Sequence, residues 1–192
     1  MLTMDHDEAT ADPVDVDDLA AADTAPTVPE LDPEAALLCA LLHTADTGAV
    51  RHITGHLVQG DFLNPRYGEL FQVLADLARA GEPHGPTRVL AALQGAGRLA
   101  GHHGKLLADA LRTVALLGTP AVGLHAHATD VLDASHRRTF VAVTHTLTRA
   151  AAEAPTDDLF DLMLNEGRAM RREWNRLLAF RNGHPSTATD AP

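Results

Sequence analysis

The sequence predicts an all-α protein, and three observations support this class. Ala and Leu dominate the apolar residues, and these unbranched side chains lose little rotamer freedom in a helix. Apolar residues recur at spacings of three and four, which is the helical period, and no strand-like alternation is found. Helix-starting residues precede most of these apolar segments, and glycine or proline follows them.

Charge divides the chain into tails and a central region. Residues 1–30 contain nine acids and neither Lys nor Arg, for a charge of −9. Such a segment has too little apolar surface to offset its ordering entropy, so we expect 1–30 and 181–192 to be disordered tails. The remaining charge is −2 (−11 less −9). A nearly neutral folded region has no overall basic excess to drive nucleic-acid binding.

Residues 31–132 are predicted to form a compact head of six helices. The first begins at Asp32-Pro33-Glu34, because Asp can cap a helix and proline suits its first turn. Asn64-Pro65 and Pro86-Thr87 open the third and fourth in the same way. The other three are predicted at Gly48–Val58, Lys105–Leu117 and 121 to about 133.

Residues 133–180 are predicted to form an antiparallel helical hairpin that turns at 154–157. Apolar positions along each arm step by alternating three and four residues. The first stripe is His136, Phe140, Val143, Leu147, Ala150 and Ala154, and the second is Phe160, Met163, Gly167, Met170, Trp174 and Leu177. We interpret the stripes as the seam between the arms. A two-helix hairpin buries little surface by itself, so we also expect packing onto the head or another chain.

Cysteine use and hydropathy restrict the class of protein further. The single cysteine, Cys39, excludes an intramolecular disulfide, and its apolar surroundings at 35–42 predict a buried, inert thiol. The sequence has no run of 18 apolar residues and no secretory signal over Met1–Glu8. We therefore expect a cytoplasmic protein without a membrane span.

No motif for nucleotide binding or nucleophilic catalysis is complete. Gly104-Lys105 could end a phosphate-binding loop, but Leu106 replaces the hydroxyl residue and Leu99 replaces the first glycine. Ser135 and His136 are sequence neighbours, and neighbours on a helix point in different directions. The carboxylates of Asp157, Asp158 and Asp161 suit a helix start better than acid–base chemistry. We expect no catalytic site and no cofactor.

The twelve histidines raise the possibility of a metal site. His52 and His56 are four residues apart, the spacing that zinc proteases use, but Ile53 stands where such proteases carry the catalytic glutamate. His102-His103 and His125-x-His127 fit turns, and no third ligand can be placed. Surface or helix-end histidines explain the sequence better, and a histidine-metal hydrolase is kept as a minor alternative.

Arginine accounts for the one basic cluster, which lies in the second predicted arm. Its members are Arg168, Arg171, Arg172 and Arg176. A solvated helix face is the first interpretation. Contact with an acidic partner is the second, and contact with nucleic-acid phosphate is the third.

The order of these features resembles a known family. Residues 33–42, Pro-Glu-Ala-Ala-Leu-Leu-Cys-Ala-Leu-Leu, and 61–71, Asp-Phe-Leu-Asn-Pro-Arg-Tyr-Gly-Glu-Leu-Phe, are similar to the opening helix and the central segment of the N-terminal domain of DnaB-family replicative helicases. Gly81-Glu82-Pro83, Gly97-Arg98-Leu99 and Arg137-Arg138 follow at similar intervals. The chain departs from the pattern at Gly85, at His127 and at His102-His103.

The resemblance implies a six-helix head followed by a hairpin. It also implies a collar domain that pairs subunits through hairpins and offers a docking surface for primase. The chain contains no ATPase motor motif. We therefore expect a non-catalytic interaction module that forms a homo-oligomer and binds a helicase or primase, with weak or no nucleic-acid binding. The candidate interface residues are Phe140, Val143, Leu147, Met163, Met170, Arg171, Arg172, Trp174 and Arg176.

Overall fold

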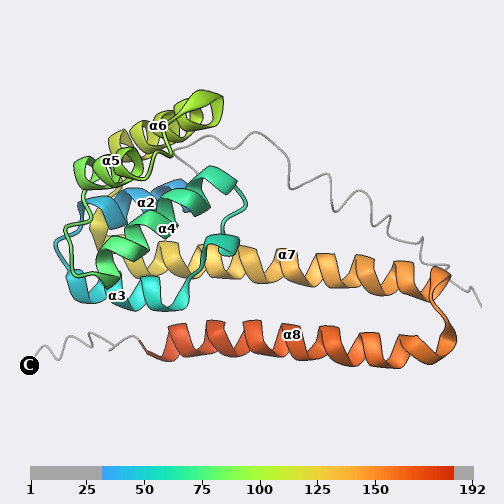
Figure 1. Ribbon diagram of the computed structural model, residues 1–192. Coiled ribbons are helices and arrows are strands. Elements are labelled where there is room, and N and C mark those ends of the chain that lie inside the picture. Colours follow the sequence, from blue (N-terminus) through green and yellow to red (C-terminus); the bar gives the residue numbers. More distant parts are fainter. Residues whose placement is uncertain (1–31, 184–192) are drawn as a thin grey trace, which may run out of the picture.

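The computed structural model describes residues 32–183, which confirm the all-α class (Figure 1). The predicted tails, apart from the last few residues of α8, lie outside this range. The described elements in chain order are α2 (Pro33–His43), α3 (Thr47–His56), η3 (Gln59–Asp61), α4 (Pro65–Arg79), α5 (Pro86–Gly95), α6 (Gly101–Leu116), η4 (Ala121–Gly123), α7 (Leu124–Glu153) and α8 (Thr156–Asn182). The two η elements are single 3₁₀ turns.

Local capping explains where the head helices begin. The side chain of Asp32 accepts a hydrogen bond of 2.9 Å from the backbone N–H of Glu34, and Pro33 occupies the first turn of α2. Asn64 does the same for α4, at 3.0 Å from the N–H of Arg66. These contacts satisfy backbone donors that have no partner within the helix, and the predicted starts of α2 and α4 are confirmed.

The core of the head is built around α2. Every residue from Glu34 to Leu42 is buried, including Cys39, as predicted for that thiol. A helix that is apolar on all sides needs neighbours on all sides, and α7, α6 and α4 supply them. In Figure 1, α5 and α6 lie on one side of α2 and α4, with α7 on the other.

The predicted boundary between head and hairpin is wrong in one respect. The sixth head helix and the first hairpin arm are a single helix, α7, preceded by the 3₁₀ turn at 121–123. Residues 124–153 contain neither glycine nor proline, so nothing interrupts the helix. Val131 is buried in the head, whereas Val143 is buried farther along the arm. The arm is therefore a continuous extension of the head.

The C-terminal boundary also differs from the prediction. The sequence predicts Arg181 and Asn182 in the tail, but both belong to α8. The guanidinium of Arg181 donates to both carboxylate oxygens of Asp133 on α7, at 2.6 and 2.7 Å. This cross-helix pair extends the contact of the two arms to the last turn of α8.

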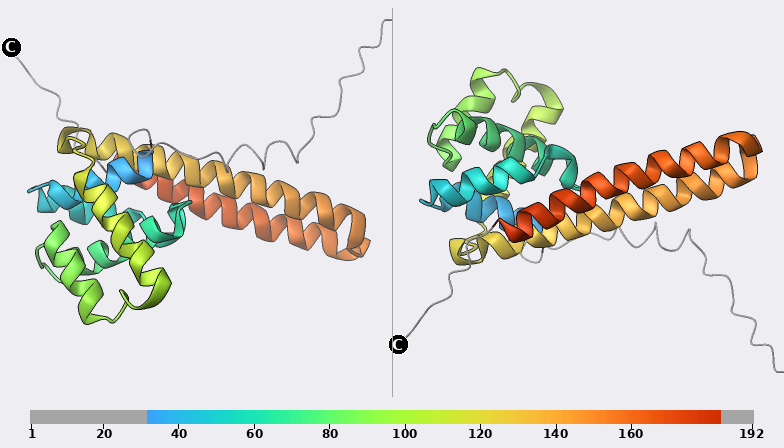
Figure 2. Two further views of the ribbon diagram at one scale, coloured as in Figure 1. Left: turned by 90° about the horizontal axis from the view of Figure 1, so that it is seen from above. Right: turned by 90° about the horizontal axis from the view of Figure 1, so that it is seen from below.

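Helices α7 and α8 run antiparallel and side by side, and their far halves project beyond the head (Figures 1 and 2). Among the described helices, none is by itself long and apolar enough to cross a membrane. Only α6 taken with 121–153 meets that test, as a pair bent by 102°. Both members of that pair contribute residues to the head core.

Candidate partner interface

A buried carboxylate, Asp61, joins the hairpin to the head. Its two oxygens accept hydrogen bonds from the guanidinium of Arg176 on α8, at 2.5 and 2.6 Å. The hydroxyl of Ser135 on α7 donates to the same carboxylate at 2.9 Å. The backbone N–H of Val58 supplies a fourth bond, at 2.7 Å. Asp61 is therefore bonded to the head and to both arms, and we call this group the Asp61 junction.

A second buried carboxylate lies beside the Asp61 junction. Glu34 at the start of α2 accepts hydrogen bonds from the backbone N–H groups of Leu63 and Asn64, at 2.6 and 3.1 Å. Arg138 on α7 lies 3.9 Å from Glu34 and donates to the carbonyl oxygen of Asp61 at 2.5 Å. Burial is the largest influence on Glu34 and raises the pKa of its carboxyl above the usual value.

The Asp61 junction corrects the prediction for Arg176. This residue was assigned to the exposed basic cluster, but its guanidinium is held by Asp61, by Glu173 and by the carbonyl oxygen of His56. The hydrogen bonds to Asp61 are the main reason that the pKa of Arg176 lies above its usual value. Arg176 therefore positions the hairpin and is not available to a partner.

The face of α8 that packs on α7 also differs from the predicted seam. Leu162 and Ala169 are shielded, and Leu177 is buried. In contrast, four residues of the predicted stripe are exposed: Phe160 (63%), Met163 (49%), Gly167 and Trp174 (38%). At about 100° per residue, these four point roughly 130° away from the centre of the packed face. The predicted seam residues of α8 are mostly on its open side.

The open side of α8 carries a row of exposed apolar residues. Its members recur at helical spacing, and Phe140 on α7, which is 56% exposed, lies one turn from His136. The ring of His136 is 5.5 Å from that of Trp174, so the two helices meet along this edge. We call the following residues the hairpin stripe: Phe140, Phe160, Met163, Leu164, Gly167, Met170 and Trp174.

Three arginines border the hairpin stripe. Arg168, Arg171 and Arg172 are exposed, and together with Met163, Leu164 and Gly167 they line an open hollow. Among the described residues, no carboxylate lies within ion-pair distance of these three guanidinium groups. The lining of this hollow therefore combines apolar and cationic side chains.

The structure thus divides the predicted interface residues into two groups. The exposed or half-exposed group lies on or beside the hairpin stripe: Phe140, Met163, Met170, Arg171, Arg172 and Trp174. The other group is engaged within the chain. Val143 is buried, Leu147 is half-buried between the arms, and Arg176 belongs to the Asp61 junction.

Sequence reasoning missed the Asp61 junction altogether. Asp61 was noted only as part of the family-like segment, and Ser135 only as an improbable nucleophile. Their partner Arg176 is 115 residues from Asp61 in the chain. The one available indication was an acidic residue directly before the aromatic Phe62, in a segment otherwise rich in apolar side chains.

The histidine pair of α3 lies at the end of the hairpin. The rings of His52 and His56 are 4.6 Å apart, and the Phe180 ring lies 5.2 Å from His52. His125 on α7 stacks on Phe180 at 4.5 Å. His52 and His125 are thus half-buried packing residues; His125 lies at the start of α7, as a helix-end histidine would, whereas His52 lies inside α3 and is neither at the surface nor at a helix end. Over residues 32–183, no three His, Cys, Asp or Glu side chains gather as a metal site.

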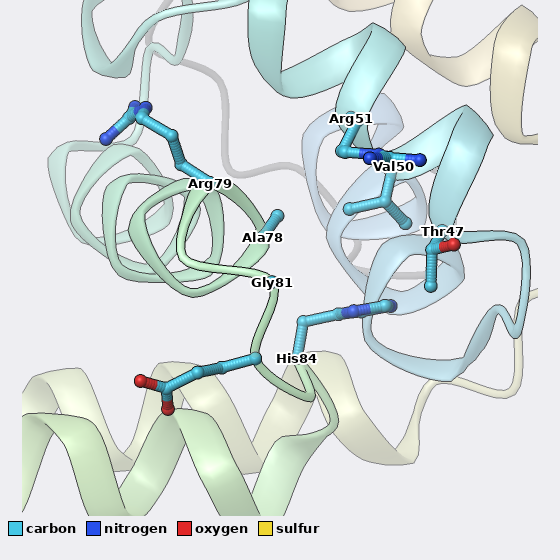
Figure 3. A pocket seen from close by; sticks show the side chains of 8 residues that line it. Thr47, Val50, Arg51, Ala78, Arg79, Gly81 and His84 are labelled. Carbon is cyan, nitrogen blue, oxygen red and sulfur yellow. The ribbon is translucent and has the colours of Figure 1, made fainter.

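A pocket of about 280 Å³ opens between α3, the end of α4 and the following loop (Figure 3). Several of its polar side chains already have partners in the chain. Arg79 pairs with Asp76, Glu82 pairs with Arg88, and the Nε2 of His84 lies 3.2 Å from the carbonyl oxygen of Thr44. Thr47 and His84 both line the pocket, and no hydrogen bond among the described residues joins their side chains.

The Gly104-Lys105 pair has a packing role. Both residues lie inside α6, not in a loop. A Cβ atom on Gly104 would stand 2.1 Å from the backbone carbonyl carbon of Leu99. Only glycine therefore fits at this position, where the backbone of Leu99 packs against the first turn of α6. Helical backbone cannot wrap around phosphates as a phosphate-binding loop does.

The chain thus consists of a helical head and a projecting two-helix arm, and buried ion pairs join the arm to the head. The DnaB-like helicase N terminal domain model matches residues 28–133, just over half of the chain. The chain therefore belongs to the family of DnaB-like helicase N terminal domains, which relates it to replicative helicases. The match covers the head and the first part of α7, whereas the rest of the hairpin lies beyond it. No curated protein matches the chain closely enough to count as a relative.

Proposed function

We propose that this chain is a non-catalytic protein-interaction module of DNA replication. The observation that carries the proposal is the hairpin stripe, where Phe160, Met163 and Trp174 are exposed on an arm that projects from the head. Exposed apolar surface of this kind marks interaction sites in folded proteins. The family membership supports a role beside a replicative helicase.

A second copy of the chain is the first partner that we propose. Helix α8 carries acids near its start, at Asp157 and Asp161, and bases farther along, at Arg168 and Arg172. These four positions are spaced by four, seven and four residues and therefore share one flank of the helix. When two such helices pair antiparallel around a two-fold axis near residues 164–165, equivalent flanks meet. Asp157 then faces Arg172 of the other copy, and Asp161 faces its Arg168.

Charge reversal tests this arrangement. We expect D157R/D161R and R168D/R172D each to weaken self-association, because like charges would then face each other across the axis. An equimolar mixture of the two variants should associate again as a mixed dimer. Light scattering behind a sizing column, at several concentrations, measures both effects. A wild-type chain that stays monomeric at high micromolar concentration would rule out the symmetric pair.

Apolar substitutions test the hairpin stripe itself. Phe160→Asp and Met163→Asp should each abolish pairing without unfolding the head. Val122→Asp is the matched control, since Val122 is 98% exposed but lies on the head. If the control disrupts association as strongly as the stripe variants, the interface lies on the head instead.

The further partners that we propose are the replicative helicase and the primase of the same cell. A pull-down with the full chain should enrich one of them, and the double substitution M170A/W174A should reduce that enrichment. Calorimetry with the purified proteins at tens of micromolar would provide direct evidence. If neither binds, the family relationship would describe the fold only.

Nucleic acid is the second candidate ligand, because Arg168, Arg171 and Arg172 lack carboxylate partners among the described residues. Binding to single-stranded DNA that weakens steeply with salt, and is lost in R168Q/R171Q/R172Q, would favour it. Salt-dependent DNA binding without any protein pairing would replace the first proposal.

A further inference from the structure

The arginines beside the hairpin stripe differ from three of the arginines in the head. Arg79, Arg98 and Arg112 each have a carboxylate partner within 3 Å. Arg168, Arg171 and Arg172 have none among residues 32–183, although they stand within two turns of one another. A cluster of unneutralised guanidinium groups around an apolar hollow is suited to a ligand that carries both carboxylates and aliphatic side chains.

The same chain contains a segment of that composition. Residues 12–19 read Asp-Pro-Val-Asp-Val-Asp-Asp-Leu, with four carboxylates interleaved with Val14, Val16 and Leu19. The surrounding stretch, 1–30, has a charge of −9 and contains neither Lys nor Arg. Its carboxylates therefore have no Lys or Arg nearby in the sequence, and no carboxylate of residues 32–183 lies within ion-pair distance of the arginines that line the hollow on α8.

The stretch of chain between this segment and α2 is also long enough for the segment to reach the hollow on α8. Helix α2 starts beside the Asp61 junction, because Glu34 lies 3.9 Å from Arg138 and Arg138 donates to Asp61. Asp61 binds Arg176, and eight residues of α8 separate Arg176 from Arg168, which is about 12 Å of helix. The thirteen peptide steps from Leu19 to Asp32 span roughly 20 Å on average and about 40 Å at full extension.

We infer that residues 12–19 bind the hollow on α8 of their own chain, with their carboxylates on Arg168, Arg171 and Arg172 and their aliphatic side chains on Met163 and Leu164. The bound segment covers part of the hairpin stripe. Any partner that uses the stripe must displace it, so the acidic segment acts as an internal competitor. The inference shares its surface with the proposed pairing but does not require that pairing to occur.

The chain carries its own reporter for this contact. Trp174 is its only tryptophan, is 38% exposed and lies three residues from Arg171 on the same face of α8. Quenching of its fluorescence by acrylamide measures how well the stripe is covered. The experiment uses the full chain at a concentration at which light scattering shows a monomer.

Two variants with equal loss of charge form the test. D12N/D15N/D17N/D18N removes the four carboxylates of the proposed segment. D5N/D7N/D23N/E30Q removes four others from the same region and is the matched control. We expect quenching of Trp174 to rise in the first variant, to stay at the wild-type level in the control, and to rise in the wild type when salt is added. A peptide of residues 10–21 should restore protection in the first variant.

Self-association provides the second measurement. Because the four substitutions remove the carboxylates that compete for Arg168, Arg171 and Arg172, pairing should tighten by about tenfold. Equal quenching in the two variants would refute the inference. Weaker association of the first variant would show that the segment bridges two copies, which would also overturn it. A quenching difference in a chain that never pairs would leave this inference standing and contradict only the proposed pairing.

Discussion

The head and the outer half of the hairpin are both helical, yet the head buries its large apolar residues and the outer hairpin exposes several of them. In the head, Phe71 and Leu37 are at most 1% exposed, and the helices surround α2 on several sides. In the hairpin, Phe160 is 63% exposed and Met163 is 49% exposed, because two helices can shield only one face of each other. The comparison indicates that head residues contribute mainly to stability, whereas the exposed stripe residues are the ones that we propose for binding.

A matched pair of phenylalanine substitutions gives the largest expected contrast. Phe71→Ala should lower the free energy of unfolding by about 3–5 kcal/mol, because it leaves a cavity in a packed core. Phe160→Ala should change it by less than about 0.5 kcal/mol, because the side chain is exposed. Urea unfolding of both variants under monomeric conditions measures the difference. Equal losses would show that the hairpin stripe is buried within the chain.

The next contrast compares two arginines on α8. Arg176→Met should destabilise the fold by about 2–4 kcal/mol, because the carboxylate of Asp61, which is 1% exposed, would lose the guanidinium that binds both of its oxygens. Arg171→Met, on the open side of the same helix, should be nearly neutral. Adding Asp61→Asn to the Arg176 variant should recover part of the loss. No recovery would mean that Arg176 stabilises through its aliphatic contacts.

Substitution of one glycine in the head and one in the hairpin should give smaller changes in stability, of opposite sign. Gly104→Ala should cost about 1–3 kcal/mol, since its Cβ would overlap the backbone of Leu99. Gly167 lies within α8, and a Cβ there meets no atom within 4 Å. Gly167→Ala should therefore stabilise the fold by about 0.5–1 kcal/mol through helix propensity. Thermal unfolding of the two variants would show shifts of opposite sign.

The smallest expected effect concerns Glu34, whose pKa is raised mainly by burial. A raised carboxyl pKa in the folded state means that the stability from this group is present at low pH. This stability is lost as the pH rises from 4.5, the ordinary pKa of the group, through the raised pKa of Glu34 in the folded state. Glu34→Gln cannot ionise, so the wild type should lose stability relative to this variant as the pH rises above 4.5. A constant difference across that range would contradict burial as the dominant influence.

The sequence by itself determined the helical class, the family and most helix starts. Capping is a local effect, so Asp32-Pro33 and Asn64-Pro65 could be interpreted without knowing what packs around them. Glycine and proline likewise marked most ends of the head helices. The continuity of α7 could not be predicted in this way, because the pattern of 121–133 and that of 136–154 looked like two separate helices.

Only the tertiary structure decided which face of α8 is covered and where Arg176 binds. Apolar residues occupy two neighbouring sets on α8, one with Leu162 and the other with Met163, and a shift of one residue rotates the face by about 100°. Periodicity identifies both sets and cannot rank them, whereas packing against α7 selects the first. Asp61 and Arg176 are likewise brought together only by folding, because 115 residues separate them and no local pattern links one to the other.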